Sequence, residues 1–94
     1  MRIIGLKKLH DFCLGHGDCR SWINNWLCDA RNADWASPHD VLGRYPTASV
    51  IGNGTIIFNV RGNIYRLETQ IAYRTQTILI LWVGTHAEYT KRYK

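Results

Sequence analysis

The sequence has no long apolar run, few acidic residues and an odd number of cysteines. Its longest apolar run, residues 78–83, is far short of the roughly 18 residues that a membrane-spanning helix needs. Residues 1–5 are too short to act as a secretory signal peptide. Three cysteines suit a reducing compartment better than a disulfide scaffold. We therefore expect a cytoplasmic protein without a membrane segment.

The 94 residues are enough for a single domain, residues 1–94, and an apolar content of 46% favours a globular fold over disorder. The charge is uneven along the chain. Residues 1–47 carry six cations and five anions, whereas residues 48–94 carry six cations and only two anions. The excess of positive charge in the second half indicates an anionic partner there, with solubility as the simpler alternative.

The first half of the chain has the apolar spacing of helices. Leu6, Leu9 and Cys13 share one helical face, and Gly15 ends that helix. Asp18 is available to cap a second helix. The apolar stripe of this second helix consists of Trp22, Ile23, Trp26, Leu27 and Ala30. We expect these tryptophans to pack against a sheet.

Two further elements complete the first half. Residues 2–4 can form a short first strand. Ser37 and Pro38 form a third helix start, with a capping serine followed by proline at the first helical position. This short helix should end near Gly43 or before Pro46.

From residue 48 the apolar period changes to two, which is typical of strands. Gly62-Asn63 is a hairpin turn pair, and Thr75-Gln76 makes a second turn into residues 77–83, expected as a buried central strand. Helices followed by an antiparallel meander predict an α+β fold, with the helices on one face of a small, mainly antiparallel sheet.

Alternation along the strands predicts where the polar side chains point. If Tyr65 and Leu67 face the helices, Arg66 then faces the open side of the sheet, together with Glu68. Arg61 is expected on that same open side, which would make a shallow basic cleft. The alternative is that Arg66 pairs with Glu68 or a cross-strand neighbour and only solvates the face.

The residues after the last strand are unusual for a C-terminal tail. Thr85-His86-Ala87-Glu88 has the form of a capping box, which predicts a short helix from His86 and gives Glu88 a structural role. On that helix His86 and Tyr89 lie on one side, with Tyr93 expected to pack against the sheet. The cations Lys91, Arg92 and Lys94 follow.

These residue types suit RNA cleavage without a metal. The 2′-OH must lose a proton, the 5′-oxygen must gain one, and the added negative charge on phosphorus must be offset. Histidine exchanges protons near neutral pH, arginine matches phosphate oxygens, and tyrosine donates a hydrogen bond or stacks on a base. Together, Arg61, Arg66, His86 and Tyr89 could meet these needs.

The N-terminal segment offers a different chemistry. Four possible zinc ligands recur every three residues: His10, Cys13, His16 and Cys19. That spacing matches no common zinc arrangement, and Gly15 interrupts the helix between them. Core or surface thiols are therefore the favoured interpretation, with a small zinc-binding interaction domain as an alternative.

Residues 35–89 resemble the HigB family of bacterial type II toxins. The matching blocks are Trp35–Pro38, Val50–Asn53, Phe58–Leu67 and Trp82–Tyr89. The resemblance implies a RelE-like fold and a ribosome-dependent mRNA endonuclease that a HigA antitoxin holds inactive. It places Asn63, Tyr65 and Arg66 in the central block and His86 and Tyr89 in the terminal one. Arg61 stands where relatives often carry lysine or glycine.

The resulting hypothesis is an endoribonuclease toxin that needs no cofactor. Arg66 offsets phosphate charge, His86 handles a proton, and Tyr89 positions or stacks on a nucleotide. The RNA-binding residues are Arg61, Asn63, Tyr65, Lys91, Arg92 and Lys94. Expected partners are the antitoxin, the ribosome and mRNA, with DNA contacted only through the antitoxin. The antitoxin is expected to cover the basic sheet face or to block entry into the ribosome. A basic RNA- or ribosome-binding module without catalysis is the alternative.

Overall fold

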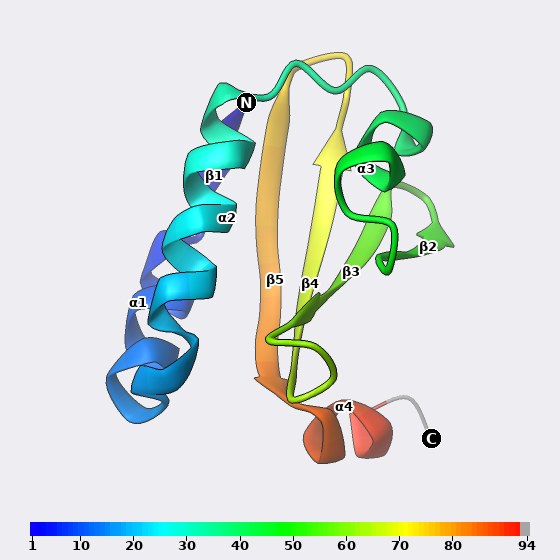
Figure 1. Ribbon diagram of the computed structural model, residues 1–94. Coiled ribbons are helices and arrows are strands. Elements are labelled where there is room, and N and C mark those ends of the chain that lie inside the picture. The colour runs from blue at the N-terminus through cyan, green and yellow to red at the C-terminus, as the bar shows by residue number, and fades with distance from the viewer. Residues whose placement is uncertain (93–94) are drawn as a thin grey trace.

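The computed structural model describes residues 1–92 as helices on one side of a sheet, with a last helix at the sheet's end (Figure 1). The helical elements are α1 (Leu6–Gly15), the 3₁₀ turn η1 (Gly17–Cys19), α2 (Arg20–Asn32), α3 (Pro38–Arg44) and α4 (His86–Arg92). The strands are β1 (Arg2–Ile4), β2 (Ser49–Gly52), β3 (Thr55–Val60), β4 (Tyr65–Ala72) and β5 (Thr77–Thr85). Among the described residues, no helix is both long and apolar enough to cross a bilayer.

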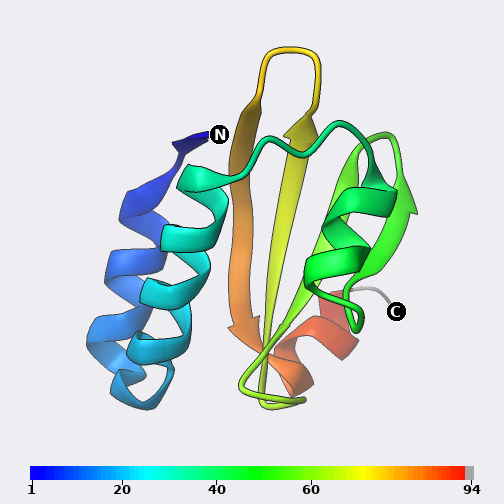
Figure 2. The ribbon, with the colours of Figure 1, turned by 45° about the horizontal axis from the view of Figure 1, so that its top comes forward.

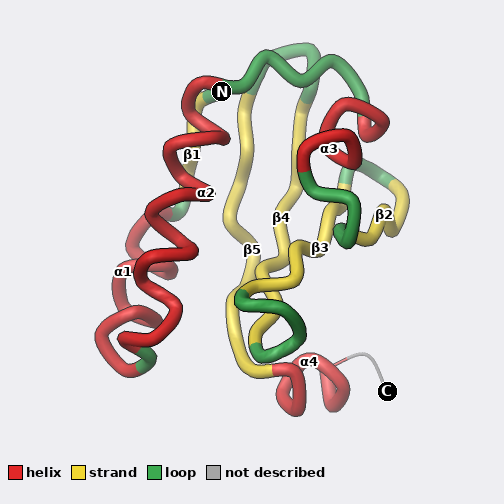
Figure 3. The backbone as a smooth tube through the Cα atoms, in the orientation of Figure 1, coloured by secondary structure: helices red, strands yellow, loops and turns green. Residues whose placement is uncertain are grey.

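The five strands form one sheet in the order β1-β5-β4-β3-β2, coloured yellow in Figure 3. The expected antiparallel meander is confirmed from β2 to β5, and β1 adds a parallel pairing to β5. The strand expected to be central, β5, instead lies second from the edge, and β4 occupies the middle. One side of β5 is also partly open, since Leu79 is 37% exposed.

Helices α1, α2 and α3 cover one face of the sheet, as Figure 2 makes clear for α2 and α3. Trp26 of α2 packs edge-on against Phe58 of β3, with ring centroids 5.3 Å apart, and both side chains are almost fully buried. Each such side chain contributes roughly 1.5–3 kcal/mol through removal of apolar surface from water. The expected packing of the α2 stripe against the sheet is thus confirmed for Trp26.

Two expected helix caps form differently. Asp18 does not cap α2, because its carboxylate accepts hydrogen bonds from Arg61 and Tyr65 at the turn between β3 and β4. Ser37 precedes α3, with Pro38 at the first position, but makes no capping bond through its side chain. The Asp40 carboxylate instead accepts a 2.9 Å bond from the amide of Ala36, which stabilises the same helix start.

The hairpin between β3 and β4 is longer than a two-residue turn. Val60 pairs with Tyr65, so residues 61–64 form the loop. Arg61 and Gly62 both have left-handed backbones, with φ of 50° and 68°. The non-glycine Arg61 is therefore part of the turn itself, and it does not continue the alternation of β3. This change of backbone redirects its side chain.

Candidate active site between the sheet and the C-terminal helix

A bulge in β5 determines which side chains reach the uncovered face. Glu68 pairs with Trp82 and Thr69 pairs with Ile80, so the pairing of β4 skips Leu81. Beyond this shift Trp82 lies on the same face as Glu68, and Val83 turns toward the helices. The bulge thereby brings an aromatic ring next to the polar residues of β4.

Helix α4 begins at the predicted capping box. The Thr85 amide donates to Oε1 of Glu88 at 2.9 Å, and the Glu88 amide donates to Oγ1 of Thr85 at 3.2 Å. The bond from the Thr85 amide is the main reason that the pKa of Glu88 lies below its ordinary value. The box is confirmed, and it commits the Glu88 carboxylate to the helix start.

The start of α4 is also tied to the β3–β4 hairpin. The amide of His86 donates to the carbonyl oxygen of Ile64 at 3.0 Å. The His86 side chain is exposed, and its Nδ1 lies 3.3 Å from Oγ1 of Thr90, one turn along the helix. The imidazole is therefore held at the surface. His86 follows Gly84, the β5 partner of Arg66, by two residues.

From there α4 folds back onto the face of the sheet that α1, α2 and α3 leave uncovered. The Arg66 guanidinium carbon lies 5.8 Å from the centre of the Tyr89 ring, and the Tyr89 and Trp82 rings are 6.3 Å apart. Arg92 lies 5.3 Å from the Trp82 ring and donates from Nε to Oε1 of Glu68 at 3.2 Å. We call Arg66, Glu68, Trp82, Tyr89 and Arg92 the C-terminal cluster.

This packing changes one expectation about the sheet. Arg66 and Glu68 do face away from the helices, as predicted, but α4 covers them in part. Glu68 is only 6% exposed, and Ile57, which lies on the same face, is 1% exposed. The basic face is therefore a compact cluster with a helix against it at this end of the sheet.

A glycine makes room for the cluster. Gly84 lies opposite Arg66 on the neighbouring strand, and the Trp82 ring folds across it. A Cβ at position 84 would come within 2.6 Å of Cη2 of Trp82, a separation that real side chains do not adopt. Any larger residue here would displace the indole on which Arg92 rests.

Arg61 and Tyr65 do not join this cluster, because both bind Asp18 on the opposite face of the sheet. The Tyr65 hydroxyl donates to Oδ1 of Asp18 at 2.6 Å, and Nη1 of Arg61 donates to Oδ2 at 2.9 Å. The expectation that Arg61 faces the open side is therefore wrong. Its left-handed turn conformation directs the guanidinium toward the loop between α1 and α2.

Asp18, Arg61 and Tyr65 form a network, here called the Asp18 network, that shifts the pKa values of Asp18 and Tyr65. The hydrogen bond from Tyr65, followed by the charge of Arg61, lowers the pKa of Asp18. The same bond raises the pKa of Tyr65 to about 12. Tyr65 is buried, and its ring meets those of Phe12 and His16 edge-on. This network joins the β3–β4 hairpin to the α1–α2 connection.

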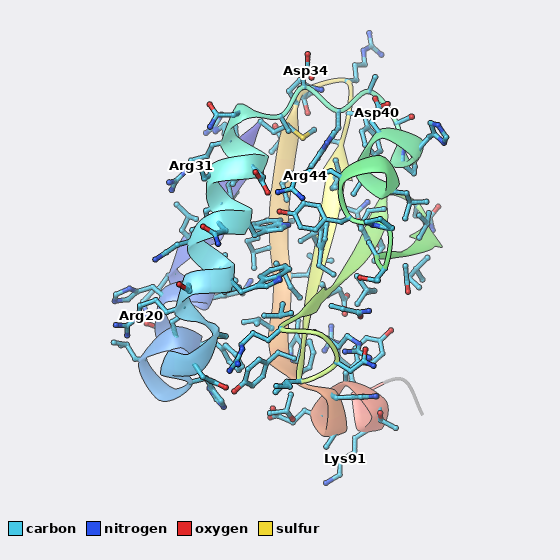
Figure 4. The ribbon with its side chains drawn as sticks, in the orientation of Figure 1. Arg20, Arg31, Asp34, Asp40, Arg44 and Lys91 are labelled. Atoms are coloured by element: carbon cyan, nitrogen blue, oxygen red, sulfur yellow. The ribbon has the colours of Figure 1, made fainter. Side chains whose placement is uncertain are left out.

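The remaining predicted RNA-binding residues are spread around α4 and the hairpin. Asn63 is exposed in the β3–β4 loop, and Lys91 is exposed near the end of α4, where its side chain extends away from the sheet (Figure 4). Arg92 lies within the C-terminal cluster. Tyr93 and Lys94 lie outside the described residues. The structure thus brings Arg66, Tyr89 and Arg92 together and places Arg61 and Tyr65 elsewhere.

The N-terminal cysteines and histidines do not converge. Sγ of Cys13 and Sγ of Cys19 are 3.8 Å apart and buried, but the His16 ring stacks on Phe12 at 4.0 Å. Within residues 1–92, no three His, Cys, Asp or Glu side chains are grouped to hold a metal ion. Burial, above all, raises the pKa of Cys19 to about 12, as expected for a thiol in a core.

Comparison with known protein families gives one informative match. A family model described as HigB_toxin, RelE-like toxic component of a toxin-antitoxin system, matches residues 19–92. The match includes the whole C-terminal cluster and the β3–β4 hairpin. It begins at Cys19, one residue after Asp18. A search of curated proteins finds no match. The α+β architecture described above agrees with a RelE-like fold.

Proposed function

The chain belongs to the HigB family of RelE-like toxins, and from this premise we propose that it is an endoribonuclease that cleaves mRNA on the ribosome. Membership of a toxin–antitoxin family implies an antitoxin partner. We propose further that this partner is of the HigA type and that the toxin acts in the cytoplasm, where ribosomes are found.

One arrangement supports this function most directly. The Arg66 guanidinium lies over the Tyr89 ring at 5.8 Å, beside the helix that begins with the exposed His86. A planar cation next to an aromatic face can bind a phosphate while the ring stacks on the base of the same nucleotide. A histidine side chain can take up or release a proton near neutral pH.

In the proposed reaction the 2′-oxygen attacks phosphorus and the bond to the 5′-oxygen breaks. One proton leaves the 2′-OH and one is added to the 5′-oxygen. His86 exchanges one of these protons, Arg66 offsets the negative charge that builds on the phosphoryl oxygens, and Tyr89 stacks on a nucleotide. The other proton is exchanged with water, so the proposed chemistry needs no metal from the toxin.

Arg92 and Glu68 have a supporting role in this proposal. Their 3.2 Å contact holds α4 on the sheet, which fixes Tyr89 against Arg66. Lys91, exposed at the end of the same helix, is available for ribosomal RNA. Asn63 is available in the adjacent hairpin loop.

Growth inhibition tests the assignment. Arg66→Ala and His86→Ala should each remove toxicity at equal expression, because loss of one group that stabilises the transition state costs about 10²–10³ in rate. Arg74→Ala is the matched control, since Arg74 is an exposed arginine in the loop between β4 and β5. Full toxicity of both site variants would refute the assignment, and circular dichroism checks that they are folded.

A second experiment tests whether cleavage requires a metal ion bound to the toxin. Ribosomes themselves require Mg²⁺, so the toxin is treated with a chelator, dialysed and only then added to ribosomes. Cleavage should be unchanged from that of untreated toxin. Loss of cleavage that added zinc restores would contradict the proposed chemistry.

A further inference from the structure

Helices α1 and α2 lie side by side (Figure 2). Side chains of both helices line a groove. The groove has a volume of about 230 Å³. Its floor is apolar and buried, formed by Leu9, Cys13 and Ile23. The partly exposed Leu6 of α1 and the half-buried Leu27 of α2 form its walls.

The charged rim of the groove is entirely positive. Arg20 and Arg31 border it, His10 of α1 lines it, and among the described residues no acidic side chain does. The two arginines are eleven positions apart on α2, which corresponds to about 16 Å along a helix at 1.5 Å per residue. Eleven residues make about three turns, so both side chains lie on nearly the same side of the helix. Figure 4 shows both on the side of α2 remote from α3.

We propose that this groove binds an acidic amphipathic helix of the antitoxin. A helix laid between two others would place its apolar residues at i, i+3, i+4 and i+7 against Leu6 and Leu27. Three of its turns would span the distance between Arg20 and Arg31, where its acidic side chains meet the two guanidinium groups. The inference rests on the proposed toxin function, because that function supplies the antitoxin.

The chemistry of the groove favours a protein over RNA. RNA-binding surfaces combine cations with exposed aromatic rings, but among the described residues no Phe, Tyr or Trp lines this groove, whose walls are the aliphatic Leu6 and Leu27. Aliphatic walls gain most from burying apolar side chains of a partner. The cations at the two ends then select an acidic partner and accelerate its association.

Docking at this groove also determines how the antitoxin inhibits. The groove belongs to the helices on one face of the sheet, whereas the C-terminal cluster lies on the other face. The bound helix would leave Arg66 and His86 uncovered. Inhibition then arises because the added bulk keeps the toxin out of the ribosome.

The test compares charge reversal inside and outside the groove. The probe is the small protein encoded next to the toxin gene, purified and titrated calorimetrically against the toxin. Arg20→Glu combined with Arg31→Glu should weaken binding roughly 30-fold or more, since like charges face each other in the complex. Leu27→Ala should also weaken it. Arg74→Glu, the same reversal on an exposed arginine that does not line the groove, should stay within about twofold.

Growth assays without the antitoxin separate the possible failures. The double variant should remain as toxic as the natural protein, because neither arginine belongs to the C-terminal cluster. Absence of toxicity in the natural protein would refute the proposed function itself. A toxic natural protein whose double variant is bound with unchanged affinity would refute the groove alone. Loss of toxicity with unchanged antitoxin binding would instead assign the groove to ribosomal RNA.

Discussion

Arg92 donates a hydrogen bond from Nε to Oε1 of Glu68 across 3.2 Å, which joins the last turn of the described chain to the middle strand of the sheet. The Glu68 side chain is largely buried, so its charge has little access to water there. Charge-assisted bonds to such a carboxylate are stronger than neutral ones. We infer that this contact positions α4, and with it Tyr89, against Arg66.

Glu68→Gln tests that positioning. The amide keeps the shape of the side chain but removes its charge, so α4 should be held less tightly on the sheet. Amide hydrogen exchange in α4 should accelerate while exchange in β3 and β4 stays slow. The rate of mRNA cleavage should fall without loss of the global fold. Unchanged exchange in α4 would show that Glu68 does not hold this helix.

Gly84→Ala tests whether the Trp82 ring needs the space above residue 84. The added methyl group would overlap the indole, and overpacking of this kind typically costs about 1–3 kcal/mol of unfolding free energy. Urea unfolding and tryptophan fluorescence give the measurement. Gly43→Ala is the control, because among the described residues no atom beyond the local helix backbone and the two chain neighbours lies within 4 Å of a methyl group at this position, and alanine is the better helix former. Equal stability of the two variants would contradict the packing described.

Asp18→Asn tests the network that joins the two halves of the chain. The folded state lowers the pKa of Asp18 below its ordinary value of 3.8, so the ionised carboxylate stabilises the fold above that pH. This stabilisation is lost as pH falls through the lowered pKa. The natural protein should therefore be more stable than Asp18→Asn at pH 7, and the difference should shrink below about pH 4.

Urea unfolding midpoints at pH 7, 5 and 3 check this expectation. Asp34→Asn is the matched control, since Asp34 is an exposed carboxylate in the loop between α2 and α3 (Figure 4). That variant should follow the natural protein at every pH. If Asp18→Asn did the same, the Asp18 network would not contribute to stability.

The parts of the structure that were predictable from sequence depend on residues close together in the chain. The two residues of the Thr85–Glu88 capping box are three positions apart. Alternation along β4 alone predicted that Arg66 and Leu67 lie on opposite faces of the sheet. Such rules depend only on the regular backbone geometry of residues that are close together in one helix or strand. For the same reason the stop at Gly15 was predictable.

The features that sequence did not reveal join distant residues. Tyr65 and Asp18 are 47 positions apart, and nothing local marks them as partners. The sequence favoured a capping role for Asp18. Its carboxylate instead accepts hydrogen bonds from the Tyr65 hydroxyl and the Arg61 guanidinium. Trp82 was also missed as a site residue, because its orientation depends on the bulge at Leu81 and on Gly84.

We propose that cleavage depends on the ribosome. Helix α4, which packs against the C-terminal cluster, begins with the exposed His86, while Glu88 is engaged in the capping box. Orientation of reactants can supply roughly 7–11 kcal/mol of a barrier, so alignment of mRNA by the ribosome would matter more than any single side chain. Binding to ribosomal RNA through exposed cations such as Lys91 should weaken with added salt.

The most direct measurement is the rate of cleavage of one mRNA, free and bound in translating ribosomes, at matched concentration and salt. We predict rapid cleavage at few positions on the ribosome and very slow cleavage of the free RNA. Arg66→Ala should abolish the rapid reaction, and Arg74→Ala should leave it intact. Equal rates on free and ribosome-bound mRNA would contradict ribosome-dependent cleavage, and so would the absence of cleavage in both.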